Sequence, residues 1–271
     1  MDLLRRALKN DVSVTLDVAA LDLAQVEFPG LLPGPYLARL DEMAETIAHR
    51  LAPGDDGIAF LRTANQYLFE EQGFGADEVD YSHPRNSCLN SVLETKCGLP
   101  ITLSLLYMEI ARRLDKSVLG IGVPGHFVVE YRDDEFSFYI DPINRGRFIT
   151  GYDCEQMSLA HANIDIANVP RALEPVTQSA LLTRMLNNML SVYLDKRETA
   201  KSVQVLDLLV EAHPREPQYY RARAAVRLRR KEYRLANFDL QSSLMRSSDA
   251  VDRTELVKDM RLIQQRLGQL N

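Results

Sequence analysis

The chain has 271 residues, of which 46% are hydrophobic and 26% are charged, a composition typical of a soluble globular protein with one or two domains. Its net charge of −6 argues against a general binder of nucleic acids or anionic membranes, because such proteins carry a basic surface. With no apolar run of membrane-spanning length, no secretory signal pattern and three widely spaced cysteines, the sequence predicts a cytoplasmic protein with free thiols.

The first third of the chain is predicted to be a series of helices separated by strong breakers. Apolar residues at helical spacing predict helices over 16–26 and 37–51, and the prolines and glycines of 29–35 separate them. A third helix is expected to be capped by Asp55 or Asp56 and to end before Gly73. A short fourth helix, capped by Asn86 or Ser87, is expected to be closed by Gly98.

Residues 100–114 are predicted to form the central helix. Pro100 suits the first helical position, where its missing N–H costs nothing. Isoleucine, leucine and methionine side chains then cover most of the helix surface, which is the pattern of a buried helix.

Three short runs rich in β-branched and aromatic residues follow, at 118–121, 127–131 and 136–140. Pro-Gly or Asp-Asp turns separate them, so they are predicted to form an antiparallel sheet packed on the buried helix. Residues 148–150 are expected to add an edge strand. The elements of residues 1–175 therefore predict a mostly helical α+β domain.

The chain from residue 176 onward is predicted to be helical again, with a period of 34 residues. This shift aligns Leu186 with Tyr220, Leu190 with Ala224, Ser202 with Ala236 and Leu206 with Leu240. Segments 183–216 and 217–250 resemble two degenerate tetratricopeptide (TPR) repeats, and 252–268 is expected to be a capping helix. Pro170 and Pro175 mark the expected boundary, so residues 176–271 are predicted to form a second, all-helical domain.

A thiol, an imidazole and a carboxylate lie at three successive element boundaries, at Cys97, His126 and Asp141. A Cys-His-Asp hydrolase or acyl-transferase uses these groups as nucleophile, base and orienting residue. His126 follows a Pro-Gly turn and Asp141 ends the next strand, so pairing of the two strands can bring them within hydrogen-bond reach. The alternative is that Asp141 caps the turn that follows it and His126 fills a strand end. No Cys-x-x-Cys, HExxH or Gly-rich phosphate motif is present, and no metal or other cofactor is expected.

An ordered series of motifs runs through the chain: Tyr81-Ser82-His83-Pro84-Arg85-Asn86-Ser87, Gly98-Leu99-Pro100-Ile101-Thr102-Leu103-Ser104, Pro124-Gly125-His126-Phe127 and Ile140-Asp141-Pro142-Ile143-Asn144-Arg145-Gly146. This series resembles the bacterial SirB1 family, whose members join a transglutaminase-like core to C-terminal TPR-like repeats. The resemblance covers nearly the whole chain. It implies a papain-like transglutaminase topology, with a nucleophile at a helix N-terminus and His and Asp on neighbouring strands. It implies a fold and not a reaction.

The resemblance also implies that the nucleophilic cysteine of such enzymes lies in the first turn of the long helix, at about Ile101 or Thr102. Cys97 precedes this turn, and at a rise of about 1.5 Å per residue an offset of several residues moves its sulfur out of attack range. We therefore expect Cys97 to be an incidental loop thiol, with an active nucleophile as the alternative.

Other candidate nucleophiles are expected to have structural roles. Thr102 and Ser104 are expected to satisfy local backbone groups or to face the core. Cys88 is expected to be a small core residue, and Cys154 is expected to lie in a loop.

Two basic groups are candidates for binding a partner. Arg145 and Arg147 flank the expected site and can bind a carboxylate or an acidic peptide, with a solvated hairpin turn as the alternative. Arg223, Arg227 and Arg230 lie close to one helical face and either hold an acidic partner segment or pair with Asp and Glu of the first domain.

Two functions are compatible with these residues. The first is a non-enzymatic or vestigially catalytic regulatory protein that binds a protein or peptide through the transglutaminase-like groove and the TPR-like surface. The alternative is an active thiol enzyme that cleaves or transfers an acyl group on an amide, with Cys97 attacking, His126 as the base and Asp141 as the orienting residue. Neither function involves nucleic acid or membrane.

Overall fold

The computed structural model describes residues 1–261 except 55, 78, 168, 170, 249–253, 255 and 259. The chain divides into two compact units, Met1–Met185 (unit 1) and Leu186–Asn271 (unit 2), and the division falls within one helix. Every helix in the described part of the chain is too short or too polar to span a lipid bilayer.

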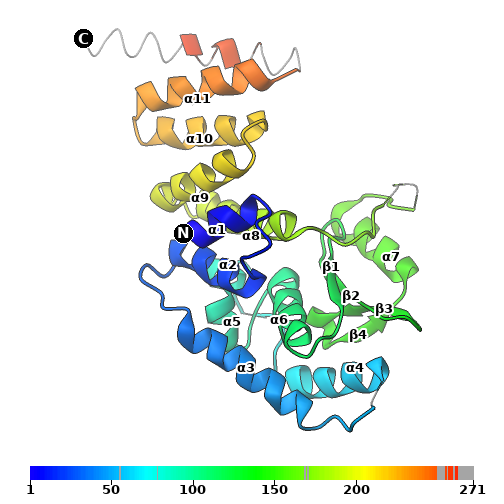
Figure 1. The fold of residues 1–271 in the computed structure, drawn as a ribbon. Helices are drawn as coiled ribbons and strands as arrows, with labels where there is room; N and C mark the ends of the chain where they lie inside the picture. The colour runs from blue at the N-terminus through cyan, green and yellow to red at the C-terminus, as the bar shows by residue number, and fades with distance from the viewer. Residues whose placement is uncertain are drawn as a thin grey trace. The chain divides into compact units, whose positions relative to one another are not determined.

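Unit 1 combines helices with one small sheet (Figure 1). Its helices are α1 (Asp2–Leu8), α2 (Leu16–Leu23), α3 (Gly34–Ala48), α4 (Gly57–Asn65), α5 (Leu89–Thr95), α6 (Pro100–Arg113), α7 (Gly151–Ala162) and the first part of α8 (Gln178–Asp195). Its strands are β1 (Val118–Ile121), β2 (Val128–Arg132), β3 (Ser137–Asp141) and β4 (Arg147–Ile149). The predicted mostly helical fold with a small antiparallel sheet is confirmed.

Helix α6 is the centre of unit 1. Pro100 occupies its first turn, as the sequence predicts, and ten of its residues are buried. The helix packs against α2, α3 and α5 as well as β1 and β2, so its side chains meet other elements all round its axis. This is the environment that a helix covered with apolar side chains requires, because exposure of any face would place those side chains in water.

The sheet has the strand order β1-β2-β3-β4, and all neighbours are antiparallel. It lies between α6 and α7 (Figure 1). On the α7 side, Cys154 joins a buried cluster with Ile121, Val128 and Ile149. The register pairs Val129 with Ile140, which sets the start of β2 beside the end of β3.

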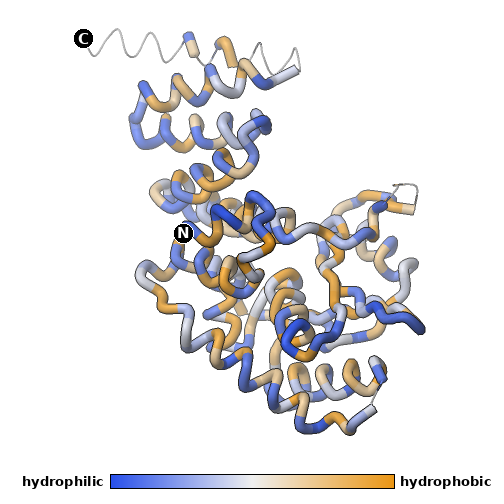
Figure 2. The backbone as a smooth tube through the Cα atoms, in the orientation of Figure 1, coloured by the Kyte–Doolittle hydropathy of each residue, from blue (hydrophilic) through white to orange (hydrophobic). Residues whose placement is uncertain are grey.

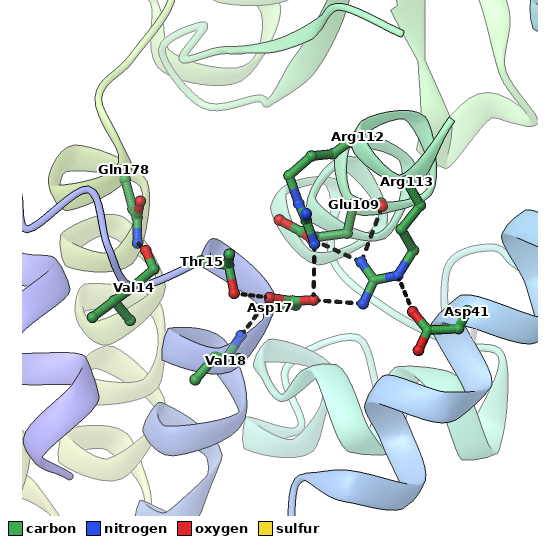
Figure 3. Close-up of polar contacts among 9 residues, drawn as sticks. All are labelled: Val14, Thr15, Asp17, Val18, Asp41, Glu109, Arg112, Arg113 and Gln178. Atoms are coloured by element: carbon green, nitrogen blue, oxygen red, sulfur yellow. Dashed lines mark hydrogen bonds and ion pairs between the residues drawn. The ribbon is translucent and has the colours of Figure 1, made fainter. Parts of the chain in front are cut away.

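A buried ion network joins α6 to α2 and α3 (Figure 3). The carboxylate of Asp17, which is 1% exposed, accepts a hydrogen bond from Arg113 at 2.7 Å and lies 3.4 Å from Arg112. Glu109, 2% exposed, accepts from the same two guanidinium groups. Arg113 also donates to Asp41 on α3 at 2.7 Å. The two arginines in the last turn of α6 therefore suit the helix dipole and also neutralise buried carboxylates.

One predicted helix start is shifted, and another is confirmed. Helix α3 begins at Gly34, inside the predicted breaker cluster, because Pro35 fits the first turn of a helix. Figure 2 shows hydrophobic and hydrophilic residues alternating along this helix, whose buried side is formed by Leu40, Met43, Ala44 and Ile47. Asp56 caps α4 by accepting from the N–H of Ala59 at 2.8 Å, whereas Asp55 lies outside the described residues.

Two local predictions are wrong. Helix α5 starts after Cys88, because Asn86 and Ser87 belong to a preceding 3-10 turn, Pro84–Ser87, and the Asn86 amide bonds instead to the carbonyls of Asp80 and Tyr81. Cys154 is not in a loop but is fully buried in α7. Helix α7 was not expected because its buried positions are only Cys154 and Ser158, which leave no apolar stripe in the sequence.

Unit 2 consists of helices within its described residues: the end of α8, α9 (Thr199–Ala212), α10 (Pro217–Arg229) and α11 (Tyr233–Arg246). Helix α10 packs against α9 and α11. The predicted capping helix over 252–268 lies almost wholly outside the described residues.

Candidate functional site

A tight turn places His126 at the start of β2. Gly125 has a φ of +73°, and a Cβ atom there would lie 2.6 Å from the Cβ of His161 on α7, so only glycine fits. The N–H of His126 donates to the carbonyl of Val123 at 2.9 Å, which closes the turn. The imidazole is buried, with 7% of the residue exposed.

The structure brings His126 and Asp141 together. The Nε2 of His126 lies 3.0 Å from Oδ1 of Asp141, a residue with no exposed surface. The side-chain amide of Asn144 donates to the second oxygen, Oδ2, at 2.7 Å. With Nε2 assigned as the donor to the carboxylate, Nδ1 is the free acceptor of the ring, and it receives no hydrogen bond from any described residue.

Two residues outside the Pro124–Phe127 motif, His161 and Arg184, also contact His126. The ring of His161 stacks on that of His126 with centroids 5.7 Å apart and an interplanar angle of 22°. Arg184 on α8 donates to the carbonyls of Val123 and His126, at 3.1 and 2.7 Å, and its guanidinium lies 5.4 Å from the Phe127 ring. Burial lowers the pKa of Arg184. Neither residue was predicted, because each lies 35 or more positions from its partner and carries no motif.

The turn between β3 and β4 is fixed by long-range hydrogen bonds. Its N–H at Gly146 donates to the carbonyl of Asp141 at 3.0 Å, and the amide of Asn65 donates to the carbonyl of Gly146 at 2.7 Å. Tyr107 on α6 in turn donates to Asn65 at 3.0 Å. Gly146 has a φ of +70°, and a Cβ atom there would collide with the Asn65 amide. This turn therefore has one fixed conformation.

Cys97 lies in the segment between α5 and α6. Its backbone segment pairs with Gly75 on the loop that follows α4, and the residue is partly exposed. Among the described residues, no hydrogen bond joins its Sγ to His126 or to any other group. Burial and the nearby charge of Asp77 raise the pKa of the thiol. A reactive cysteine needs a lowered pKa, so this environment disfavours the thiolate.

The hydroxyl groups of Thr102 and Ser104 on α6 form no hydrogen bond with His126 either. Thr102 is fully buried; its Oγ1 is placed to donate to the carbonyl of Asn86 at 2.7 Å and accepts from the N–H of Leu99 at 2.9 Å. Ser104 is fully buried, and its Oγ has no hydrogen-bond partner in the described part of the chain. The expectation that these residues bond locally or face the core agrees with their positions.

A groove of about 680 Å³ opens at the turn that follows Asp141, and neither His126 nor Asp141 is among its lining residues. Asn144, which bonds to Asp141, is one of its lining residues, and Gly75, which pairs with Cys97, is another. The full lining consists of Phe69, Gly73, Phe74, Gly75, Ala76, Ile143, Asn144, Arg145 and Arg147. Arg145 and Arg147 are exposed, and neither forms an ion pair or a side-chain hydrogen bond with any described residue.

The model of the transglutaminase-like superfamily matches residues 35–187 of this chain, which includes α6, the sheet, His126 and Asp141. The chain belongs to the transglutaminase-like superfamily. The match covers more than half of the sequence and agrees with the His-Asp pair at the paired ends of β2 and β3.

This superfamily member is similar to bacterial and animal proteins. A UPF0162 protein of Pseudomonas aeruginosa is 28% identical over 254 residues, which are 93% of this chain and 89% of the relative. A UPF0162 protein of Xylella fastidiosa is 28% identical over 221 residues, 79% of this chain and 77% of the relative. The human F-box only protein 21 is 30% identical over 171 residues, which are 58% of this chain and 26% of that protein. No solved structure matches.

The predicted basic face of the superfamily member lies in unit 2 and is internally paired. Arg223, 9% exposed, donates two hydrogen bonds to the buried Asp239, at 2.7 and 3.0 Å, and one to Asp207. Arg227 also donates to Asp239, and Arg230 donates to Glu232. The carboxylates that pair with these arginines thus come from unit 2 itself. Whether the three arginines also contact a partner stays a prediction.

The described residues contain no group of three or more His, Cys, Asp or Glu side chains placed to hold a metal ion. Cys88 and Cys154 are buried and outside any disulfide, and the pKa of Cys154 is raised to about 12, mainly by burial. Neither thiol lies in the groove lining.

Proposed function

We propose that this chain is a non-enzymatic or vestigially catalytic protein that binds a peptide segment of a protein partner in the groove at the turn that follows Asp141. One observation supports this above all: the base and its orienting carboxylate are in place, yet no described thiol or hydroxyl group is hydrogen-bonded to the imidazole. A groove of about 680 Å³ is within the range of natural ligand pockets.

The chemistry of nucleophilic catalysis explains why this observation matters. The reacting atoms must approach to roughly 3–3.5 Å, and the nucleophile must be activated by a base or by a lowered pKa. Cys97 has a raised pKa and makes no hydrogen bond to His126. The groove is large enough for a ligand, while this thiol lacks the hydrogen bond to a base that would activate it.

Alkylation of Cys97 tests the absence of thiol catalysis. We expect iodoacetamide at pH 6 to modify Cys97 slowly, at the rate of an unactivated thiol, and His126→Ala to leave that rate unchanged. Mass spectrometry of the Cys97 peptide measures both rates, with the buried Cys88 and Cys154 as internal references.

An active thiol enzyme is the second candidate, and the intact His126–Asp141 pair favours it. In this case, Cys97 attacks an amide, His126 accepts the thiol proton and Asp141 orients the ring. Rapid alkylation at pH 6 that is lost in His126→Ala, or a thioester trapped on Cys97, would establish this enzyme instead.

A groove-filling variant tests the binding function. Ala76 lines the groove and is partly exposed, so Ala76→Trp places an indole in the space for the peptide. Peptides selected from a displayed random library on the wild-type protein should lose binding to Ala76→Trp. They should keep binding to Gln156→Trp, in which the same side chain is added at an exposed position of α7 outside the lining. Equal binding to all three proteins would contradict the proposal.

We also propose that unit 2 is a pair of TPR-like repeats, as in the SirB1 family, and offers a second partner surface. Helices α9 and α11 begin at Thr199 and Tyr233, 34 residues apart. The residues aligned by this period are buried in both segments: Leu186 and Tyr220, Leu190 and Ala224, Ser202 and Ala236, Leu206 and Leu240. A repeat whose equivalent positions share burial supports this proposal. The absence of a disulfide among the three described cysteines supports a reducing, cytoplasmic location.

A further inference from the structure

We propose that the occupant of the groove is an acidic segment of a partner protein, whose carboxylates pair with Arg145 and Arg147. This inference rests on the binding function proposed above and names the chemistry of the partner. It starts from two exposed arginines that line this groove in a chain of net charge −6 and form no ion pair or side-chain hydrogen bond with a described residue, although the charge of Arg147 lowers the pKa of Asp153.

Arg145 and Arg147 differ from the other arginines discussed above in having no hydrogen bond to a carboxylate. Arg113, Arg223 and Arg227 are each bonded to buried carboxylates. Arg145 and Arg147 make no such contact with the described residues, although both are exposed. Guanidinium groups bind carboxylates through paired N–H donors, so two guanidinium groups whose donors form no hydrogen bond, at one opening, favour a ligand with more than one carboxylate.

The backbone holds both arginines in place before any ligand arrives. Arg145 has a φ of +56° at the end of a 3-10 turn, Pro142–Asn144, and Arg147 is the first residue of β4. Between them, Gly146 is locked by its bonds to Asp141 and Asn65. Because the backbone at these positions is fixed, less conformational entropy is lost when a ligand binds. The two arginines can then discriminate between ligands by the spacing of their carboxylates.

The walls of the groove suit an extended peptide. Phe69 and Phe74 are buried and present only a small apolar surface, while Gly73 and Gly75 leave part of the wall without side chains. Lys96 lies over the Phe74 ring at 4.3 Å and adds a third positive charge close to this wall. Two carboxylates oppose this positive charge: Asp77, which accepts hydrogen bonds from the N–H groups of Asp80 and Val79, and Asp153, whose pKa the charge of Arg147 helps to lower.

The same features disfavour a nucleic acid. Single-stranded nucleic acids are held by aromatic rings on which bases stack, together with a long basic track. Phe69 and Phe74 are 5% and 2% exposed and offer no face for stacking. Two rim arginines do not make a basic track. An RNA oligonucleotide is therefore a comparison ligand in the test and not the proposed occupant.

Fluorescence anisotropy with the full chain tests the inference. The probe is a fluorescein-labelled ten-residue peptide of alternating Asp, Glu and Ala, compared with its Asn, Gln and Ala counterpart and with a ten-nucleotide RNA. The test variant is Arg145→Gln/Arg147→Gln. The control is Arg215→Gln/Arg229→Gln, which removes the same charge from exposed positions in unit 2. Circular dichroism verifies that each variant is folded.

We expect the acidic peptide to bind wild type and control equally, the test variant about tenfold more weakly, and the affinity to fall with added salt. Equal loss in both double variants, or tighter binding of the RNA than of the acidic peptide, would overturn the inference. Equal binding of the acidic and amide peptides, with loss in Ala76→Trp, would also overturn it while leaving the proposed groove function intact. If no peptide binding responds to Ala76→Trp, both proposals fail.

Discussion

Gly146 connects three parts of the candidate site. It separates the two rim arginines, its carbonyl accepts from Asn65, and its N–H bonds to the carbonyl of Asp141. Its left-handed backbone and the proximity of Asn65 leave no room for a Cβ atom. The shape of the groove rim and the position of the Asp141 carboxylate therefore depend on the same residue.

Gly146→Ala should lower the free energy of unfolding by about 3 kcal/mol, because it adds a steric clash to the cost of a positive φ. Urea denaturation measures the change. Gly30→Ala is the matched control, since Gly30 has a φ of +82° but no atom near the added Cβ, and it should cost about 1 kcal/mol. An equal loss of unfolding free energy in Gly146→Ala and Gly30→Ala would show that the contact with Asn65 does not contribute to the loss.

At the scale of elements, α6 is held to α2 by Asp17 as well as by apolar packing. Burial alone raises the pKa of Asp17, but hydrogen bonds from Thr15 and Arg113 outweigh it, and the pKa ends below its ordinary value. The pKa of Glu109 is raised by burial and by the charge of Asp17. The pKa values of these two carboxyl groups are therefore shifted in opposite directions, although both groups pair with Arg112 and Arg113.

Asp17→Asn should destabilise the protein by about 3 kcal/mol at pH 7, because it removes one of the two buried carboxylates that pair with Arg112 and Arg113. The folded-state pKa of Asp17 is lowered, so its stabilisation is present above its unfolded pKa of about 4 and is lost as the pH falls through the folded value. The difference from wild type should shrink towards pH 2 in urea denaturation. Asp41→Asn, which removes a 60% exposed partner of the same arginine, should cost less than about 1 kcal/mol at either pH.

Elements defined by local pattern were predictable, and those defined by distant contacts were not. Pro100 and the apolar run after it identify α6, and Asp56 caps α4 as one of the two expected alternatives. The cap of α5 was assigned wrongly because Asn86 has carbonyl partners in the preceding loop that compete with the helix N-terminus. Helix α7 packs through Cys154 and Ser158, which give no hydrophobic period.

The contacts of the candidate site also divide into those that local sequence patterns predict and those that they do not. Turn and strand signals predict His126 beside Asp141, and the structure has this contact at 3.0 Å. Asn65 and Arg184 contact the site from 81 and 58 residues away, and no local pattern in a single sequence encodes such a contact. The catalytic assignment of Cys97, His126 and Asp141 and the binding roles of Arg145 and Arg147 stay predictions.

At the scale of the whole molecule, each unit has its own buried polar centre. In unit 1, this centre is the network around Asp17 and Glu109; in unit 2, it is Asp239, which has no exposed surface and accepts from Arg223 and Arg227. Two compact units with separate cores are expected to respond separately to a local loss of stability.

Asp239→Asn should destabilise unit 2 by about 3 kcal/mol, because two buried guanidinium groups lose their shared anion. Hydrogen exchange followed by mass spectrometry should show faster exchange in α10 and α11 and no change in β1–β4, and peptide binding in the groove should be retained. Asp207→Asn, at a 48% exposed partner of Arg223, is the control and should change exchange little. Faster exchange throughout the sheet would contradict separate responses of the units.

The amide of Asn144 belongs to the groove lining and also bonds to the carboxylate that orients His126. An occupant that draws this amide towards itself removes a donor from Asp141, and the freed oxygen makes the carboxylate a stronger acceptor for the ring N–H. The imidazole thus serves as an intrinsic spectroscopic reporter: its proton resonance in NMR should move when the groove fills, without any added label.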